Sequence, residues 1–187
     1  MSYIVKNPEN LFKRRVFFFG YGSLMYPEGI NKRGMTKSYK SDMMDRALLY
    51  DYKRGSYASY QGHHYYSLIE QSKACVNGVI FEIFSYDDLD ILLKDEGAHE
   101  VYRKTEDGVM YELAVVTDRI FDLWIPFGAH VVTLVHPPYK PAHERNMDAW
   151  YVNTVWNGIQ MWGRDFIKKF LETGGEANVS RSAGFIP

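Results

Sequence analysis

The feature that most constrains this chain is an apolar run that stops abruptly at two glycines. Residues 16–19 read Val-Phe-Phe-Phe, and Gly20, Tyr21, Gly22 and Ser23 follow them. The run predicts a buried strand, and the glycines permit backbone angles that leave consecutive N–H groups outside the sheet. Such groups bind anions, especially where a helix begins directly after them. The turn therefore predicts a site for a carboxylate or a developing oxyanion, although an ordinary strand-to-helix turn also explains these four residues.

Four further runs, enriched in β-branched and aromatic residues, predict strands. They are residues 46–52, 76–84, 109–117 and 129–135. Residues 53–74 are rich in Tyr, Ser, Gly and His and show no clear period. We expect loops in that segment, with at most a short hairpin.

A second kind of pattern, near the far end of the chain, predicts helices. Apolar residues recur there at intervals of four and three on one helical face and stop at Gly163, and a short helix over 165–171 follows. The face consists of Met147, Tyr151, Val155, Ile159 and Trp162.

The order of these elements predicts the fold class. Strands and helices that mix without strict alternation indicate a mixed α/β protein of the α+β type, with a small mixed β-barrel flanked by helices. We expect a single domain over residues 1–187, with 1–14 as an entry arm and 173–187 as a loose tail.

The composition favours a small-molecule ligand. The 22 Lys and Arg residues and 23 Asp and Glu residues give no single-sign field, so we expect neither nucleic acid nor a membrane as a partner. Residues 1–10 lack an apolar core of signal-peptide length, and the single cysteine, Cys75, fits a reducing compartment. We therefore expect a cytoplasmic protein; the sequence indicates no oligomeric state.

A glutamate at an unfavourable position is the strongest candidate for chemistry. A predicted helix begins at Ser85, presents Leu89, Leu92 and a neighbouring leucine on one face, and ends at Gly97, directly after Glu96. The partial negative charge at the carboxyl end of a helix disfavours an ionised carboxylate. The pKa of Glu96 should therefore rise toward neutrality, which suits a general base. The alternative is a solvated surface residue.

Other reactive side chains indicate no second chemistry. The adjacent residues His63 and His64 cannot both face one ion from a strand, and the sequence contains no His-x-x-x-His pair, so we expect no metal. Cys75 lies at the edge of a predicted strand, where a small buried hydrophobic residue is a better interpretation than a thiol nucleophile. We expect no cofactor.

Four ordered blocks of the sequence are together similar to one known family. They are FGYGSLM, VNGVIFEIF, LLKDEGAHEVYRK and YVNTVWNGIQMWGRDFIKKFL, and they fall within residues 15–171. In this order and spacing the chain resembles the gamma-glutamylcyclotransferase family. The resemblance implies a small mixed barrel that makes 5-oxoproline from gamma-glutamyl compounds without metal or cofactor.

The resemblance also implies roles for individual residues. Glu96 matches the catalytic acid and base of the family. The implied substrate-binding residues are Tyr21, Gly22, Ser23, Leu24, Tyr102 and Tyr151. The first four form the substrate-binding loop, and Tyr151 matches the tyrosine that closes the pocket.

Some parts of the chain depart from the family pattern. Residues 53–74 and 136–146 do not align with it, and Leu93 stands where the family often has Asp. Glutathione, gamma-glutamyl amino acids and gamma-glutamyl amines all remain open as substrates. The alternative to an enzyme is a non-catalytic binding module that keeps the same pocket.

Overall fold

The strand that leads into the glycine turn lies in the middle of the sheet. The computed structural model describes residues 3–99, 101 and 108–175, and within them six strands form a sheet in the order β1-β5-β6-β2-β4-β3. β2 (Val16–Gly20) lies between β6 (His130–Val135), which is parallel to it, and β4 (His63–Ile83), which is antiparallel. Because β2 has a neighbour on each side and is largely buried, it reads as a continuous apolar run.

The other elements follow the predicted order. The remaining strands are β1 (Tyr3–Ile4), β3 (Met44–Tyr60) and β5 (Glu112–Val115), and the α-helices are α1 (Pro27–Asn31), α2 (Tyr86–Asp95), α3 (Ala149–Gln160) and α4 (Arg164–Phe170). Short helical turns are η1 (Pro8–Lys13), η2 (Ser23–Met25), η3 (Ser41–Met43), η5 (Thr117–Arg119) and η6 (Leu171–Gly175). The predictions of β2, β6, α2, α3 and α4 are confirmed, and β5 is shorter than the predicted strand.

A long β3–β4 hairpin replaces the loops predicted for residues 53–74, so that prediction is wrong. Pairing between the two strands runs from Met44 opposite Phe81 to Tyr60 opposite His63. The segment that we expected to be irregular is therefore the outer part of the hairpin.

Two irregularities explain why the sequence pattern misled. Asp51 and Lys73 both have positive φ, and the strand register shifts beside them, which interrupts the alternation of apolar and polar side chains. The hairpin turn has φ of 49° at Gln61 and 82° at Gly62. Positive φ at both positions is the geometry of a type I′ turn, for which Asn-Gly or Asp-Gly is the usual signal. Gln-Gly gives a weaker signal.

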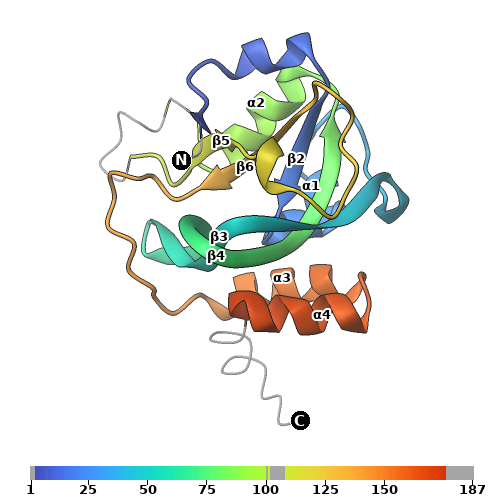
Figure 1. Cartoon of the computed structure of the whole chain (residues 1–187). Coiled ribbons are helices and arrows are strands. Elements are labelled where there is room, and N and C mark those ends of the chain that lie inside the picture. The colour runs from blue at the N-terminus through green and yellow to red at the C-terminus, as the bar shows by residue number, and fades with distance from the viewer. Residues whose placement is uncertain (1–2, 100, 102–107, 176–187) are drawn as a thin grey trace.

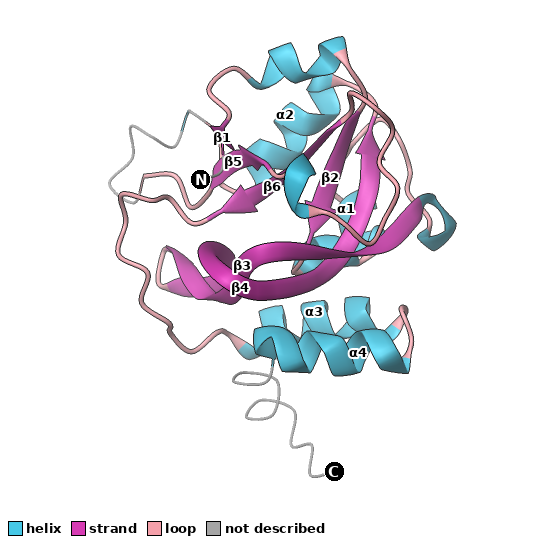
Figure 2. Ribbon diagram, in the orientation of Figure 1, coloured by secondary structure: helices cyan, strands magenta, loops and turns pink. Residues whose placement is uncertain are grey.

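The sheet curls, and helices flank it. Figure 1 shows the β3–β4 hairpin strongly bent, with α3 and α4 side by side below it and α2 toward the opposite end of the molecule. Figure 2 shows the same arrangement by type of element. The fold is a mixed α+β half-barrel flanked by helices, in agreement with the predicted fold class.

Both ends of the described chain contact this fold. β1 pairs with β5, so the predicted arm over residues 1–14 contributes an edge strand. Thr173, at the start of the predicted tail, accepts a hydrogen bond from Arg54 at 3.0 Å, and residues 176–187 lie outside the described part. In the part of the chain that the structure describes, no helix combines the length and apolar character needed to cross a membrane.

A buried arginine connects the glycine turn to the carboxyl-terminal helices. Arg54 of β3 is fully buried, and its Nη1 donates to the carbonyl oxygens of Tyr21 (3.0 Å) and Asn77 (3.1 Å). Its Nη2 donates to the carbonyl oxygen of Phe170 (3.1 Å) and to Thr173 Oγ1 (3.0 Å). Burial lowers the pKa of Arg54 to about 10, so the guanidinium stays charged at neutral pH. One side chain thus fixes the start of the turn to β4 and α4.

We expect Arg54→Met to lower the free energy of unfolding by about 3 kcal/mol, because each buried carbonyl left without a donor costs about 1–3 kcal/mol. Arg46→Met is the matched control, since Arg46 lies on the same strand but is exposed, and its effect should stay within about 0.5 kcal/mol. Urea unfolding measures both values. Equal stability of the two variants would contradict the role of Arg54.

Candidate active site

A cleft of about 330 Å³ opens where the glycine turn, the end of α2, the β3–β4 hairpin and α3 meet. Its lining includes Ser23, Arg33, Tyr65, Glu96, Tyr111 and Tyr151. Three of the residues expected from the sequence therefore meet in one cleft, although they are far apart along the chain: Ser23, Glu96 and Tyr151.

The local structure of α2 places Glu96 at the helix end. The helix begins at Ser85, whose Oγ accepts a hydrogen bond from the N–H of Asp88 at 3.2 Å. At the other end the N–H of Glu96 donates to the carbonyl of Leu92 at 3.0 Å. Gly97 then takes a φ of +68°, which ends the helix directly after the carboxylate.

The Glu96 carboxylate is largely removed from water. Its side chain is 15% exposed. Burial raises the pKa of Glu96, and the ion pair with Arg33 opposes the rise, while the charge of Asp95 adds to it. The net pKa is raised, which is the direction that the sequence predicts. The main cause is burial rather than the end of the helix.

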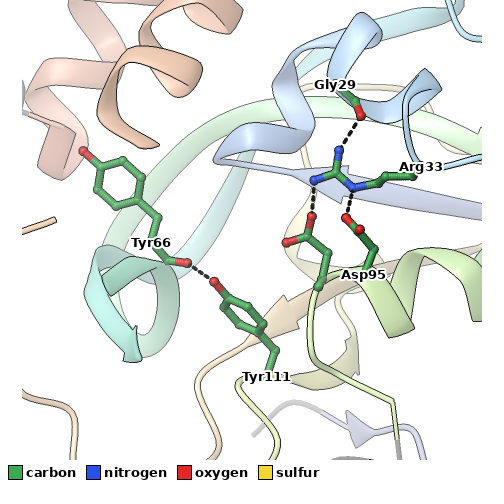
Figure 3. Close-up of polar contacts among 6 residues, drawn as sticks. Gly29, Arg33, Tyr66, Asp95 and Tyr111 are labelled. Carbon is green, nitrogen blue, oxygen red and sulfur yellow. Dashed lines mark hydrogen bonds and ion pairs between the residues drawn. The ribbon is translucent and has the colours of Figure 1, made fainter. Parts of the chain in front are cut away.

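Arg33 contacts both carboxylates at the end of α2. Its Nη2 forms an ion pair with Glu96 Oε1, and its Nε lies 2.6 Å from Asp95 Oδ2. Its Nη1 donates to the carbonyl of Gly29 in α1 at 2.6 Å. Figure 3 shows the guanidinium between Gly29 and Asp95. Because α1 follows the glycine turn closely, Arg33 connects the two predicted parts of the site.

The residues of the predicted substrate-binding loop do not all face the cleft. Ser23 lines it. The side chain of Tyr21 is buried, and its hydroxyl donates to the carbonyl of Leu134 at 2.9 Å, while Leu24 packs into the core. The roles of Tyr21 and Leu24 toward a ligand stay predictions, and contact through their side chains is disfavoured by these positions.

Tyr151 of α3 packs directly against the turn. A Cβ atom on Gly22 would lie 2.8 Å from the Tyr151 hydroxyl oxygen, so the close approach requires glycine. Burial and the negative charge of Glu96 raise the pKa of Tyr151, while hydrogen bonding by the backbone of Tyr66 and Ser23 opposes the rise. The Tyr151 hydroxyl therefore stays protonated at neutral pH beside the turn.

Further aromatic side chains form the wall of the cleft. Tyr65 of β4 packs edge-on against Tyr151 with ring centroids 5.0 Å apart, and Trp150 contacts both rings. The Tyr111 hydroxyl donates to the carbonyl of Tyr66 at 2.8 Å (Figure 3). Burial raises the pKa values of Tyr65 and Tyr111, so these hydroxyls are neutral at physiological pH.

Sequence reasoning missed several residues of the cleft. Tyr65 lies in the segment that was expected to be loops, and Arg33 belongs to no recognisable motif. Asp95 and Tyr111 lie within a predicted helix and a predicted strand, but the sequence pattern did not indicate that either side chain lines a site. Tyr102 falls outside the described residues. Within residues 3–99, 101 and 108–175, no group of three or more His, Cys, Asp or Glu side chains is close enough together to hold a metal ion.

Solved structures share this arrangement of sheet and helices. YkqA from Bacillus subtilis matches with a TM-score of 0.63 and 19% identity over 88% of this chain, which spans 55% of YkqA. The uncharacterized human protein loc79017 matches with a TM-score of 0.57 and 16% identity over 83% of this chain and 85% of that protein. A gamma-glutamyl cyclotransferase matches with a TM-score of 0.54 and 14% identity over 83% of this chain and 85% of that protein. The chain has a gamma-glutamylcyclotransferase-like fold.

No family model and no curated protein sequence matches the chain. The gamma-glutamylcyclotransferase-like fold therefore rests on three-dimensional similarity at low identity. A fold of this kind does not fix the chemistry of its site, which depends on the side chains that line the cleft.

We expect Gly22→Ala to destabilise the protein by about 1–3 kcal/mol, because the new Cβ collides with the Tyr151 hydroxyl. In a Tyr151→Phe background the cost should be smaller, since the nearest remaining ring atom, Cζ, lies 3.9 Å from the Cβ position. Urea unfolding of the four proteins in a double-mutant cycle measures the coupling. A coupling energy of zero would show that the hydroxyl is not what excludes a side chain at position 22.

Proposed function

We propose that this protein converts a gamma-glutamyl amine or peptide into 5-oxoproline and the free amine, with Glu96 as general acid and base. The observation that carries the proposal is the largely buried Glu96 carboxylate, with its raised pKa, in the cleft beside the glycine turn. The solved gamma-glutamyl cyclotransferase with a similar fold supports it.

The reaction needs no nucleophile from the protein. The α-amine of the gamma-glutamyl group attacks the side-chain carbonyl carbon, a new C–N bond closes the five-membered ring, and the original amide C–N bond breaks. A cleft that holds the substrate folded removes rotational entropy, and well-oriented intramolecular reactions reach effective molarities on the order of 10⁵ M or more. What remains for the protein is to move protons and to stabilise charge.

Glu96 is suited to the proton transfers. An α-amine has a pKa of about 8 and is mostly protonated near neutrality, so a base has to remove a proton before or during attack. The same carboxyl group then donates a proton to the departing nitrogen. A pKa above the ordinary value of glutamate brings Glu96 nearer to the operating pH, which favours both steps.

The glycine turn supplies donors for the charge that develops on oxygen. The N–H groups of Ser23 and Leu24 precede the first hydrogen bond of η2, which the N–H of Met25 makes to the carbonyl of Gly22, and the backbone of Ser23 also hydrogen-bonds the Tyr151 hydroxyl. In our proposal they hold the carbonyl oxygen or the α-carboxylate of the substrate. The protonated Tyr151 hydroxyl, next to Gly22 and Ser23, is a further donor at the same place.

The proposal predicts release of 5-oxoproline from at least one gamma-glutamyl compound. Glutathione, gamma-glutamyl dipeptides and gamma-glutamyl-lysine form the test panel, with a chelator present and mass spectrometry as the readout. Product is expected without added metal, because the proposed steps use only Glu96 and hydrogen-bond donors. If folded protein binds panel members but produces no 5-oxoproline, the non-catalytic binding module becomes the better account.

We expect Glu96→Gln to reduce the rate by roughly 10²–10⁴-fold, since glutamine keeps the shape of the side chain but cannot accept the proton. The matched control is Asp90→Asn, which removes a carboxylate from the same helix that pairs with Lys94 and His99 rather than lining the cleft. The control should keep near-normal activity. Normal turnover by Glu96→Gln in steady-state assays would mean that Glu96 is not the base.

A further inference from the structure

Arg33 contacts two elements, α1 and the end of α2. The proposed chemistry requires that their relative position stays fixed. Through Nη1 it binds the carbonyl of Gly29 in α1, the helix that follows the glycine turn. Through Nε and Nη2 it binds Asp95 and Glu96 at the end of α2. Its side chain is only 12% exposed, so these contacts are largely protected from water.

The charges at the end of α2 would repel one another without this cation. Asp95 and Glu96 are consecutive carboxylates, and the carboxyl end of a helix adds a partial negative charge. Neighbouring like charges disfavour ionisation of the more buried group, which here is Glu96. A base that is not ionised cannot accept a proton from the substrate.

We propose that Arg33 is the positioning residue of this site, which holds the Glu96 carboxylate in place and ties it to the segment that carries the glycine turn. This inference rests on the proposed function of Glu96 and adds to it a residue that contacts the base rather than the substrate. The ion pair uses Oε1 of Glu96, and in this arrangement Oε2 takes up the proton of the substrate amine.

The geometry of arginine, as well as its charge, is required. A guanidinium offers several N–H groups in a planar fork, and here Nη1 and Nη2 donate to Gly29 and Glu96 while Nε lies in an ion pair with Asp95. Lysine carries the same charge on a single ammonium group that cannot copy this fork. The two residues therefore separate positioning from charge in an experiment.

The tyrosines that the described part of the chain places around Glu96 are uncharged at neutral pH. Besides Arg33 and Asp95, the charge of Glu96 acts on four tyrosines, of which one directly follows β2, one lies in β4, one directly precedes β5 and one lies in α3. These are Tyr21, Tyr65, Tyr111 and Tyr151, and the pKa of each is raised. Among the described residues, the changes that most directly alter the ionisation of Glu96 are therefore at Arg33 and Asp95.

The test measures the ionisation of Glu96 by two independent routes. The first is the acidic limb of the pH–rate profile, along which activity is lost as pH falls and the base becomes protonated. The second is an NMR pH titration of protein labelled with ¹³C in the glutamate carboxyl groups, with the Glu96 signal assigned by its absence from Glu96→Gln. The second route needs no substrate.

Two variants should shift the pKa of Glu96 in opposite directions. Arg33→Met removes the cation, so the titration and the acidic limb should move to higher pH, and kcat should fall by roughly 10–100-fold because the base is no longer held in place. Asp95→Asn removes the like charge, so both should move to lower pH. Lys32→Met, an exposed neighbour, is the control and should change neither.

Arg33→Lys separates the two contributions of Arg33. Because the charge is kept, the titration of Glu96 should stay close to that of the unmodified protein, while kcat still falls and KM changes less. A full return of kcat in Arg33→Lys would overturn the positioning role and leave only a charge effect. Circular dichroism and thermal unfolding identify any variant that fails to fold.

The outcomes distinguish this inference from the proposed function. If Arg33→Met leaves both the titration and the acidic limb unchanged, the inference is wrong. If that variant does not fold, Asp95→Asn provides the test. A Glu96 titration that is unchanged in Asp95→Asn, or that moves to higher pH, overturns the inference. If the unmodified protein releases no 5-oxoproline but the titrations shift as expected, the hold of Arg33 on Glu96 is supported and the proposed function fails.

Discussion

The buried guanidinium of Arg54 is the interaction on which the arrangement of this molecule depends most. It reaches from the middle of β3 to the carbonyl oxygen of Tyr21 and, on its other side, to the carbonyl oxygen of Phe170. The ring of Phe170 also lies 3.7 Å from the guanidinium carbon. Burying a full charge away from water is costly. The charge of Arg54 is tolerated here because backbone oxygens accept hydrogen bonds from its guanidinium. The position of the glycine turn is thereby tied to α4, which packs against α3, the helix that carries Tyr151.

Two arginines thus hold different parts of the site, and they do so in different ways. Arg54 binds mainly neutral oxygens in the dry interior, so its contribution is to hold segments together. Arg33 binds two carboxylates at the edge of the cleft, so its contribution is electrostatic as well as geometric. The raised pKa of Glu96 is the balance between burial and the opposing charge of Arg33. The proposed base therefore depends on packing and on a charged neighbour at the same time.

The sequence predicted those parts of the molecule that depend on short-range pattern. The apolar run before Gly20 became β2, the leucine face after Ser85 became α2, and the glycine at 97 ended that helix as expected. The outer part of the β3–β4 hairpin was missed because bulges break its alternation and its turn is Gln-Gly. Arg33 and Arg54 were missed for a different reason: a long cationic side chain carries no signal of the distant carbonyls or carboxylates that it reaches.

The irregular register of the hairpin also has a consequence for the cleft. The pairing offset between β3 and β4 changes at two places, near Asp51 and again between Gly55 and Ala58. Side chains on a strand alternate between faces, so a slip of one residue exchanges every inward position for an outward one. Tyr65 forms the cleft wall, whereas the ring of its neighbour Tyr66 packs against Phe170. Ala58, which follows the second shift, pairs with Tyr65, so the register at this bulge determines which of the two tyrosines lines the cleft.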